Sequence, residues 1–449
     1  MAKTEAALRE VGKQESILEN LFKLSANKTN VKTELLAGVT TFLTMAYILI
    51  VNPYFLGVEA GMDLGAVFVA TAVAAAVGSL LMGLLANYPI ALAPGMGLNA
   101  FFTYTVVLTM GVSWQTALAA VFVSGAIFFL LTLFKIREAI INAIPANLKH
   151  AVSAGIGLFI AFVGLKNAEI IVADPGTFIA FSRTLTSPGV LLTFFGIIIT
   201  LFFMMKQVKG GIFYGMILTG IVGWIFGIVA TPAGVFAAPP SVEPTFMQMD
   251  FKGLMNMGVI TIIFSFLFVD FFDTAGTLVG VANQAGLLKD NKLPRAGRAL
   301  TADAVATMVG AMFGTSTTTS YIESSAGVAA GGRTGLTAVF TGLMFILALF
   351  FFPIIESVAG VAAITSPALI IVGVLMATSL KEIEWKNFDD AVPAFFTMLM
   401  MPLTFSIATG ISLGFIVYPL LKVFAGKAKE VHPIMYVLGV LFVVRFIFL

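Results

Sequence analysis

The stretch GVITIIFSFLFVDFFDTAGTLVG, residues 258–280, determines how the rest of the chain is interpreted. At ~1.5 Å per residue, a helix of this length crosses the ~30 Å hydrocarbon core of a bilayer. It nevertheless contains two carboxylates, Asp270 and Asp273, with no basic residue near them in sequence. Residues three positions apart lie on roughly the same face of a helix. An acidic side chain inside a membrane is costly and usually faces a cavity where it serves a function; capping of a broken helix is the alternative.

The composition indicates that the whole chain is a membrane protein. Of its 449 residues, 59% are hydrophobic and 11% are charged, whereas ~25% charged residues is normal for soluble domains. Apolar runs of spanning length recur, which predicts a polytopic helical membrane protein. The chain has no cysteine, and His150 and His432 lie at segment edges, so we expect neither thiol chemistry nor a metal or other cofactor. The net charge of +2 does not indicate a nucleic-acid partner.

Apolar runs predict an all-α polytopic fold of fourteen transmembrane segments. The first seven are 33–51, 64–86, 91–110, 114–134, 148–165, 188–205 and 211–229. The second seven are 258–281, 297–313, 321–331, 334–352, 362–380, 392–407 and 410–424. The apolar sequence of residues 433–449 predicts an additional helix that either lies at the membrane interface or spans the membrane.

The third and tenth segments contain stretches that are too polar and glycine-rich for ordinary spans. These are APGMGLNA at residues 93–100 and GTSTTTSYIESS at residues 314–325. Non-helical backbone is tolerated at membrane depth only where it is buried in protein or lines a cavity. We therefore expect an extended stretch and a short helix in each, with the helix N-termini directed toward the centre of the protein.

The distribution of Lys and Arg predicts the orientation. With the N-terminus in the cytoplasm, the opposite side would hold only Lys166, Arg183 and Lys252, which is a strong positive-inside asymmetry. The N-terminal sequence MAKTEAALREVGKQES lacks the apolar core of a signal peptide. We expect a cytoplasmic N-terminus and, from the short loops, a location in the bacterial inner membrane.

Three pairs of similar sequences, in the same order, predict that the two halves are repeats. SGAIFFLLTLF resembles TGLMFILALFF, GLFIA resembles GVLMA, and GIFYGMI resembles GISLGFI; they begin at residues 124 and 341, 157 and 373, and 211 and 410. Because each half has an odd number of segments, the second copy would be inverted. Inverted repeats are typical of transporters, with the substrate site near the midplane.

This symmetry predicts the division of the chain. It comprises a cytoplasmic N-terminal segment 1–32, a first inverted repeat 33–229, an extracytoplasmic connecting loop 230–256, a second inverted repeat 257–424 and a C-terminal segment 425–449.

Two further polar residues are predicted to join the acids of the eighth segment. Glu323 and Asn99 occupy corresponding places at the starts of the two short helices. Asn99 can donate and accept at once, as recognition of a planar heterocycle requires. Helix capping is the alternative role for both residues.

Other residues near these positions have more ordinary interpretations. The hydroxyls of residues 317–320 are expected to satisfy irregular backbone. Since the chain has 43 Phe, core packing is the better prediction for most nearby aromatic side chains, although any of them could stack on a flat ring; these are Phe101, Phe102, Phe271, Phe272 and Tyr321.

Three motifs resemble those of the xanthine/uracil permease superfamily of nucleobase–cation symporters. They are ALAPGMGLNAFFTYTVV (91–107), FDTAGTLVGVANQAGLL (272–288) and YIESSAGVAAGGRTGLTAV (321–339), and they are most similar to the hypoxanthine/guanine/adenine permease branch. The resemblance implies fourteen segments in two inverted repeats, divided into core and gate domains. It also implies short antiparallel strands in the third and tenth segments with the substrate between them, and proton-coupled nucleobase uptake, often by a homodimer.

The resemblance also assigns roles to individual residues. Asp273 and Glu323 match the substrate-binding acids of the eighth and tenth segments, and Asn99 matches the polar residue of the third. Asp270 matches a second acid of the purine branch. The sequence departs from uracil-type relatives in having Thr277 where they carry a histidine, and Asp rather than Glu at 273. The complete set expected to contact substrate is Asp273, Glu323, Asn99, Ala100, Thr277, Ser320, Ile322 and Ser324.

These residues suggest a mechanism for purine uptake by proton symport. The carboxylates of Asp273 and Glu323 would accept hydrogen bonds from ring N–H groups, while Asn99 and helix N–H groups would donate to ring acceptors. Burial and neighbouring acids disfavour the ionised form, so Asp270, Asp273 or Glu323 would carry the coupling proton. Two acidic acceptors favour hypoxanthine and guanine over adenine.

Other functions make different demands on the sequence. An anion carrier of the same fold would need a basic residue at the site, and the third, eighth and tenth segments have none in their central parts. Coupling to Na⁺ in place of H⁺ is a further alternative. A channel would not need inverted halves around titratable acids, and an aspartyl protease needs its acids on facing helices. We therefore expect a transporter rather than an enzyme.

Overall fold

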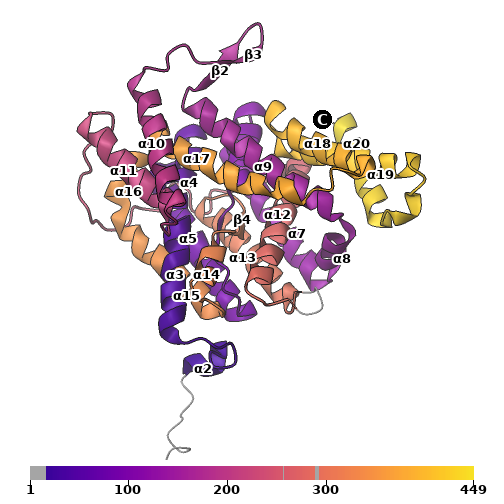
Figure 1. Ribbon diagram of the computed structural model, residues 1–449, viewed down its shortest axis with the longest axis horizontal. Helices are drawn as coiled ribbons and strands as arrows, with labels where there is room; N and C mark the ends of the chain where they lie inside the picture. The colour runs from indigo at the N-terminus through magenta and orange to yellow at the C-terminus, as the bar shows by residue number, and fades with distance from the viewer. Residues whose placement is uncertain (1–16, 256, 289–292, 449) are drawn as a thin grey trace, which may run out of the picture.

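The computed structural model describes residues 17–255, 257–288 and 293–448, and most of them are helical (Figure 1). The first half contains α2 (Ile17–Phe22), α3 (Val31–Met45), α4 (Ile48–Asn52), η1 (Pro53–Glu59), α5 (Leu64–Leu81), η2 (Met82–Ala86), β1 (Leu92–Pro94), α6 (Met96–Ala100), η3 (Phe101–Thr109), α7 (Trp114–Leu133), α8 (Ile136–Ala143), α9 (Ala146–Asn167), β2 (Ile171–Asp174), β3 (Phe178–Phe181), α10 (Pro188–Met205) and α11 (Gly211–Ile225).

The second half repeats this helical character. It contains η4 (Gly253–Met255), α12 (Met257–Gln284), α13 (Ala296–Phe313), β4 (Thr318–Ser320), α14 (Ser324–Ala329), α15 (Gly335–Ala348), η5 (Leu349–Phe351), α16 (Phe352–Ala359), α17 (Ala362–Ala377), η6 (Thr378–Glu382), α18 (Phe388–Leu403), α19 (Ile407–Phe424), η7 (Ala428–Glu430) and α20 (Pro433–Phe448).

The helices confirm a multi-pass membrane protein. Within the described residues, nine helices are long and apolar enough to cross a bilayer, and three shorter apolar helices accompany them. Several predicted segments are shorter than a full span or are broken, so the number fourteen stays a prediction. Caps explain where helices begin: the side chains of Asp63, Ser113 and Ser187 accept hydrogen bonds from the first turns of α5, α7 and α10.

The helices pack in two groups. The first group contains α3, α4, α5, α6, α7, α12, α13, α14 and α15 with strands β1 and β4; the second contains α9, α10, α11, α17, α18 and α19. Contacts between the groups are fewer and include those of α6 and α12 with α9. Residues 230–252, between the two halves, form an irregular loop that reaches back to α7 and α13 through backbone hydrogen bonds from Asp250 N–H to the Gln115 carbonyl and from Met247 N–H to the Met312 carbonyl.

A reciprocal contact at the centre of the second group supports the predicted symmetry. A Cβ on Gly157 would stand 2.7 Å from the Gly373 carbonyl oxygen, and a Cβ on Gly373 would stand 2.5 Å from the Gly157 carbonyl oxygen. These glycines begin GLFIA and GVLMA, two of the sequences matched between the halves. Each helix therefore approaches the other through the same position, as a local two-fold relation requires.

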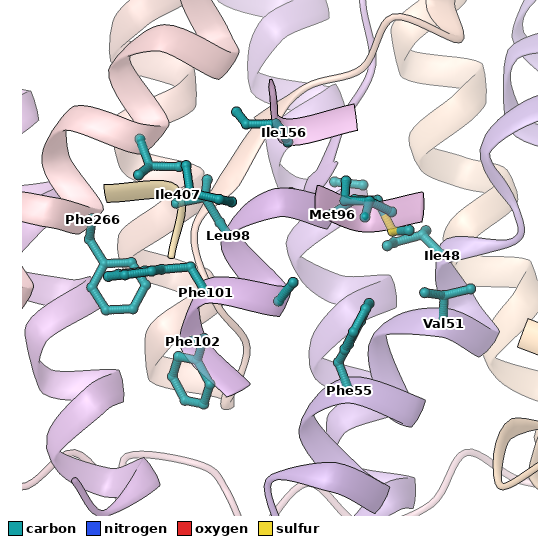
Figure 2. Packing of buried hydrophobic residues seen from close by; sticks show 14 of the residues in the cluster. Ile48, Val51, Phe55, Met96, Leu98, Phe101, Phe102, Ile156, Phe266 and Ile407 are labelled. Carbon is teal, nitrogen blue, oxygen red and sulfur yellow. The ribbon is translucent and has the colours of Figure 1, made fainter. Parts of the chain in front are cut away.

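The phenylalanines beside the irregular stretches pack in the core, as expected. Figure 2 shows Phe101 beside Phe266 of α12, and the centroid of the Phe102 ring lies 6.3 Å from that of Phe266. The Phe101 and Phe266 rings have centroids 5.0 Å apart and are nearly perpendicular. Phe271 packs against Phe128. Tyr321 is different, because it also lines a cavity described below.

A small hairpin in the loop between α9 and α10 was not predicted. Strands β2 and β3 pair antiparallel, with Ile171 opposite Phe181 and Asp174 opposite Phe178. The Asp174 carboxylate accepts hydrogen bonds from the Gly176 and Thr177 N–H groups, which hold its pKa below the ordinary value. The hairpin projects from one end of the molecule, and α2 lies at the opposite end (Figure 1).

Candidate functional site

A cavity lies beside strands β1 and β4, where the two helix groups meet. Ser153 of α9 and Val372 and Met376 of α17 line it from the second group. The remaining lining residues are Tyr47, Met96, Gly97, Asp273, Thr277, Thr319, Ser320, Tyr321, Ile322 and Glu323. Five residues expected to contact substrate are therefore brought together here, including both predicted binding acids.

The two strands hold the irregular segments against one another at this cavity. They pair antiparallel, with Leu92 opposite Ser320 and Pro94 opposite Thr318. Gly95 N–H donates to the Thr317 carbonyl at 2.9 Å, and Tyr321 N–H donates to the Ala91 carbonyl at 3.0 Å. The extended stretches predicted from sequence are thus present. The helices that follow them are short: α6 has five residues and α14 has six.

Neighbouring helices satisfy the strand groups that point away from the partner strand. Residues in alternate, non-hydrogen-bonded pairs direct their N–H and C=O groups outward. The Ser79 hydroxyl of α5 bonds both the N–H and the carbonyl of Leu92, at 3.0 and 3.2 Å. The Thr307 hydroxyl of α13 bonds both groups of Thr318, at 3.2 Å each. One helix hydroxyl therefore bonds both backbone groups of one strand residue in each case, which joins β1 to α5 and β4 to α13.

Asp273 is positioned by close approach of the β1 end to α12. A Cβ on Gly95 would stand 2.9 Å from Thr319 Oγ1 and 3.2 Å from Asp273 Oδ2. A side chain at this position would therefore force Thr319 to shift and would press on the Asp273 carboxylate. The Asp273 carboxylate thus reaches the cavity directly beside the strand pair.

Glu323 does not cap a helix, although it precedes α14. Its side chain makes no capping bond, and its Oε1 accepts a 2.6 Å hydrogen bond from the Tyr47 hydroxyl. Tyr47 lies between α3 and α4 and itself lines the cavity. The capping alternative is therefore wrong for Glu323, whose carboxylate is held in the cavity wall by a phenol.

Three other predicted substrate contacts do not line the cavity: Asn99, Ala100 and Ser324. Asn99 is buried, its Oδ1 accepts a hydrogen bond from the Ser316 hydroxyl, and its Nδ2 has no partner in the described part of the chain. Ser324 Oγ accepts a 3.0 Å bond from Ala91 N–H. Ser324 thus bonds the residue that precedes β1, and contact of all three residues with substrate stays a prediction.

Asp270 belongs to a second polar cluster, buried away from the cavity lining. Its Oδ1 lies 3.3 Å from the Thr274 hydroxyl, which is also 3.1 Å from Asp303 Oδ1. Arg137 donates to Asp303 Oδ2 at 2.7 Å and to the Leu300 carbonyl at 3.3 Å. Both members of this ion pair are fully buried. Asp270 Oδ2 has no partner among the described residues.

Sequence reasoning missed three residues of these clusters. Asp303 is a lone carboxylate within the predicted ninth segment, so the argument applied to Asp270 would have found it. Arg137 follows the fourth segment and looked like a loop cation, but its side chain is fully buried. Tyr47 had no polar neighbour in sequence to mark it. Among the described residues, no group of three potential ligand side chains could hold a metal ion.

Comparison with known proteins identifies the family. A model of the Permease family, that of the xanthine/uracil permeases, matches residues 32–413. The chain belongs to this family. Its members are transporters rather than enzymes, as expected from the sequence.

The chain is similar over nearly its whole length to several permeases. It is 55% identical to the guanine/hypoxanthine permease PbuG of Bacillus subtilis, over 96% of this chain and 100% of that protein. It is 45% identical to the adenine permease AdeP of Escherichia coli, over 97% of each. A putative permease of Methanocaldococcus jannaschii, MJ0326, is 53% identical over 96% of this chain and 98% of that protein.

Solved structures show the same fold at low sequence identity. The transmembrane domain of the cyanobacterial bicarbonate transporter BicA superposes with a TM-score of 0.63 at 16% identity, covering 85% of this chain and 97% of that one. The murine anion transporter Slc26a9 gives 0.61 at 11% identity, covering 92% of this chain and 73% of that one. At these identities the likeness concerns the fold alone.

Proposed function

We propose that this permease imports purine nucleobases by proton symport. The observation that carries the proposal is the cavity that brings Asp273 and Glu323 together and has no Lys or Arg among its described lining residues. Relatives with named substrates include guanine/hypoxanthine permeases at 55% and 48% identity and an adenine permease at 45% identity. Hypoxanthine and guanine are therefore the substrates expected first, with adenine as a third candidate.

The cavity suits a neutral, planar base better than an anion. Carboxylates accept hydrogen bonds, and hypoxanthine and guanine carry several N–H donors in one plane. Two carboxylates without a counter-charge would repel an anion at short range. Although this chain shares its fold with anion transporters, we therefore do not propose an anion as its substrate.

The second cluster supplies a place for a proton next to the substrate site. A threonine hydroxyl has one proton, so Thr274 cannot donate fully to Asp270 and Asp303 at once. In this proposal Asp303 is ionised beside Arg137 and accepts the hydrogen bond of the Thr274 hydroxyl. Asp270 then bonds Thr274 as a neutral acid, one helical turn from Asp273. In this mechanism Asp270, Asp273 and Glu323 share the coupling proton, and binding of base at Asp273 and Glu323 changes its position.

The position of the cavity supports alternating access. Its walls come from both helix groups, so sliding of the first group past the second would expose it first to one side and then to the other. In this proposal the first group is the core domain and the second is the gate domain. We place the protein in the inner membrane with its N-terminus in the cytoplasm, and a homodimer is the proposed assembly.

The test is uptake of radiolabelled hypoxanthine by cells that lack their own purine permeases. Wild-type protein should give saturable uptake that a protonophore abolishes and that replacement of Na⁺ by choline leaves intact. Glu323→Gln and Asp273→Asn should each reduce uptake at least tenfold, or ~1.4 kcal/mol, because each removes a charged acceptor. Unlabelled guanine, adenine, xanthine and uracil rank the substrates by competition.

Glu243→Gln, in the exposed connecting loop, is the matched control and should transport as wild type does. Uptake that requires Na⁺ would show that Na⁺ rather than H⁺ is the coupling ion, and it would leave the proposed substrate unchanged. Absence of uptake of every base by well-expressed wild type would reject the proposal in favour of another substrate class.

A further inference from the structure

A large apolar groove opens on the side of the molecule away from α20. It has a volume of about 720 Å³ and is bounded by α3, α4 and α15 on one side and by α11 and α16 on the other. Its wall includes Met216, Ile217 and Leu347, the last two of which are about half exposed. The groove therefore lies at the boundary between the two helix groups and faces the surroundings of the protein.

The matched sequences of the two halves identify a counterpart of this groove. The match between residues 124–134 and 341–351 pairs α7 with α15, and that between 211–217 and 410–416 pairs α11 with α19. The order of the segments pairs α3 and α4 with α12. The counterpart is therefore bounded by α12 and α19, near α8, which follows α7.

That counterpart is filled by the C-terminal helix. The Phe442 ring of α20 contacts Phe264 and Phe268 of α12 and Phe415 of α19, with centroids 5.2–5.6 Å apart. Helix α20 also packs against α8. Figure 1 shows α20 beside α18 and α19 at one side of the molecule and α11 and α16 at the other. No described segment of the chain fills the groove beside α11.

The groove lacks the polar anchor that holds α20. Arg445 of α20 donates to the Ser412 hydroxyl at 2.6 Å and to the Ala408 carbonyl at 3.2 Å. In the matched sequences GISLGFI and GIFYGMI, Ser412 corresponds to Phe213, which lines the groove. The Ser357 hydroxyl already bonds the Ile354 carbonyl, and the Trp224 indole N–H bonds Thr231. The groove is thus suited to a purely apolar occupant rather than a second anchored helix.

We propose that this groove binds an acyl chain of a membrane phospholipid. Apolar surface of this extent at membrane depth is covered by lipid unless protein covers it. Trp224 lies in the wall where α11 ends, and tryptophan is enriched at the level of lipid headgroups. The chain would enter at this end and lie between the two helix groups, in the place that α20 takes on the opposite side.

The test uses tryptophan fluorescence quenching by brominated lipid. The chain has three tryptophans, Trp114, Trp224 and Trp385, which are all changed to Phe. Met216→Trp then reports from inside the groove, and Leu343→Trp reports from the lipid-facing side of α15, where Leu343 is 41% exposed. Both proteins are placed in vesicles of phosphatidylcholine brominated at mid-chain. Met216→Trp should be quenched at least half as strongly as Leu343→Trp.

Gly220→Leu is the decisive second change. A Cβ on Gly220 has Val358 Cγ1 at 3.3 Å as its nearest neighbour, so a leucine side chain projects into the groove. It should halve the quenching of Met216→Trp or reduce it further, and leave that of Leu343→Trp unchanged. Gly189→Leu on α10, where nothing lies within 4 Å of the Cβ, is the matched control.

Quenching of Met216→Trp below half of the Leu343→Trp value, or quenching unaffected by Gly220→Leu, would overturn the proposal. If Met216→Trp does not yield a folded protein, Ile217→Trp replaces it, since Ile217 lines the same wall and is 40% exposed.

Discussion

At the scale of single residues, the buried pair of Arg137 and Asp303 is the most demanding feature of the structure. Two ions removed from water lose several kcal/mol of solvation each, and only close mutual contact offsets this. Arg137 also lies over the Phe128 ring, 4.1 Å from its centroid, which gives the guanidinium a second favourable contact. The pair connects α8 to α13 and, through Thr274, to Asp270.

Arg137→Met should destabilise the protein by about 3–5 kcal/mol, because Asp303 is left as an uncompensated buried charge. The double variant Arg137→Met/Asp303→Leu should recover part of this loss. Thermal unfolding in detergent measures both. Lys381→Met, which breaks the exposed pair with Glu382, is the control and should leave the melting temperature unchanged. A single variant as stable as wild type would show that the pair is not formed.

Gly95→Ala should impair transport without unfolding the protein. Its Cβ would displace Thr319 or the Asp273 carboxylate, which stand 2.9 and 3.2 Å away. We expect at least a tenfold loss in uptake at limiting substrate, equivalent to ~1.4 kcal/mol. Gly276→Ala on α12 has no neighbour within 4 Å of its Cβ and is the matched control. Equal uptake by the two variants would contradict the proposed placement of Asp273.

The free-energy cost of burying a charged group explains which site residues could be identified from the sequence. Asp270, Asp273 and Glu323 stand out because a carboxylate in an apolar segment needs a reason. Tyr47 and Arg137 do not stand out, because their roles depend on partners more than 160 positions away. Asn99 was predicted to contact substrate, with helix capping as the alternative; it is the fourth residue of α6 rather than its cap, and its orientation toward Ser316 depends on tertiary packing.

At the scale of elements, the strand pair depends on two hydroxyls. Pro94 lies in a non-hydrogen-bonded pair, so its missing N–H removes no bond between the strands. The outward groups of Leu92 and Thr318 still need partners, and Ser79 and Thr307 supply them.

Thr307→Val should therefore destabilise the strand pair. The Thr318 N–H and carbonyl would be buried without partners, at a cost of about 1–3 kcal/mol. Thr301→Val on the same helix should be close to neutral, because that hydroxyl bonds only the Gly297 carbonyl of its own helix. Uptake and thermal unfolding measure the effect; similar behaviour of the two variants would show that Thr307 is not needed by β4.

The elements that the sequence predicted best are long apolar segments with clear start or stop residues at their ends. Segments 64–86 and 188–205 agree with α5 plus η2 and with α10. The π-helical turns η1, η2 and η3 could not be predicted, because they change hydrogen-bond register without changing apolar character. The β2–β3 hairpin was missed because its strands have only four residues each.

At the scale of the whole molecule, the two helix groups should move relative to one another during transport. The natural lack of cysteine allows a direct test. A Cβ on Gly97 of α6 would stand 3.9 Å from the Cβ of Ile156 on α9, which suits a disulfide. In Gly97→Cys/Ile156→Cys, oxidation should join the groups and reduce uptake at least tenfold compared with the same variant kept reduced.

A pair within the first group provides the comparison. The Cβ of Ala74 lies 3.4 Å from a Cβ on Gly310, and oxidation of Ala74→Cys/Gly310→Cys should leave uptake at its reduced level. Equal uptake by the oxidised and reduced forms of the first pair, with the disulfide confirmed by mass, would show that transport does not need movement between the groups.

The pairing of β1 with β4 also has a consequence for biosynthesis. The Tyr321 hydroxyl and the Pro94 carbonyl that it bonds are 227 positions apart in the chain. At ~5–20 residues per second, a ribosome needs roughly 10–45 s to make the intervening chain. Until then β1 has no partner strand, although unpaired backbone is costly in lipid. The third segment of the newly made chain must therefore remain near water, the insertion machinery or the lipid headgroups until the second half arrives to complete it.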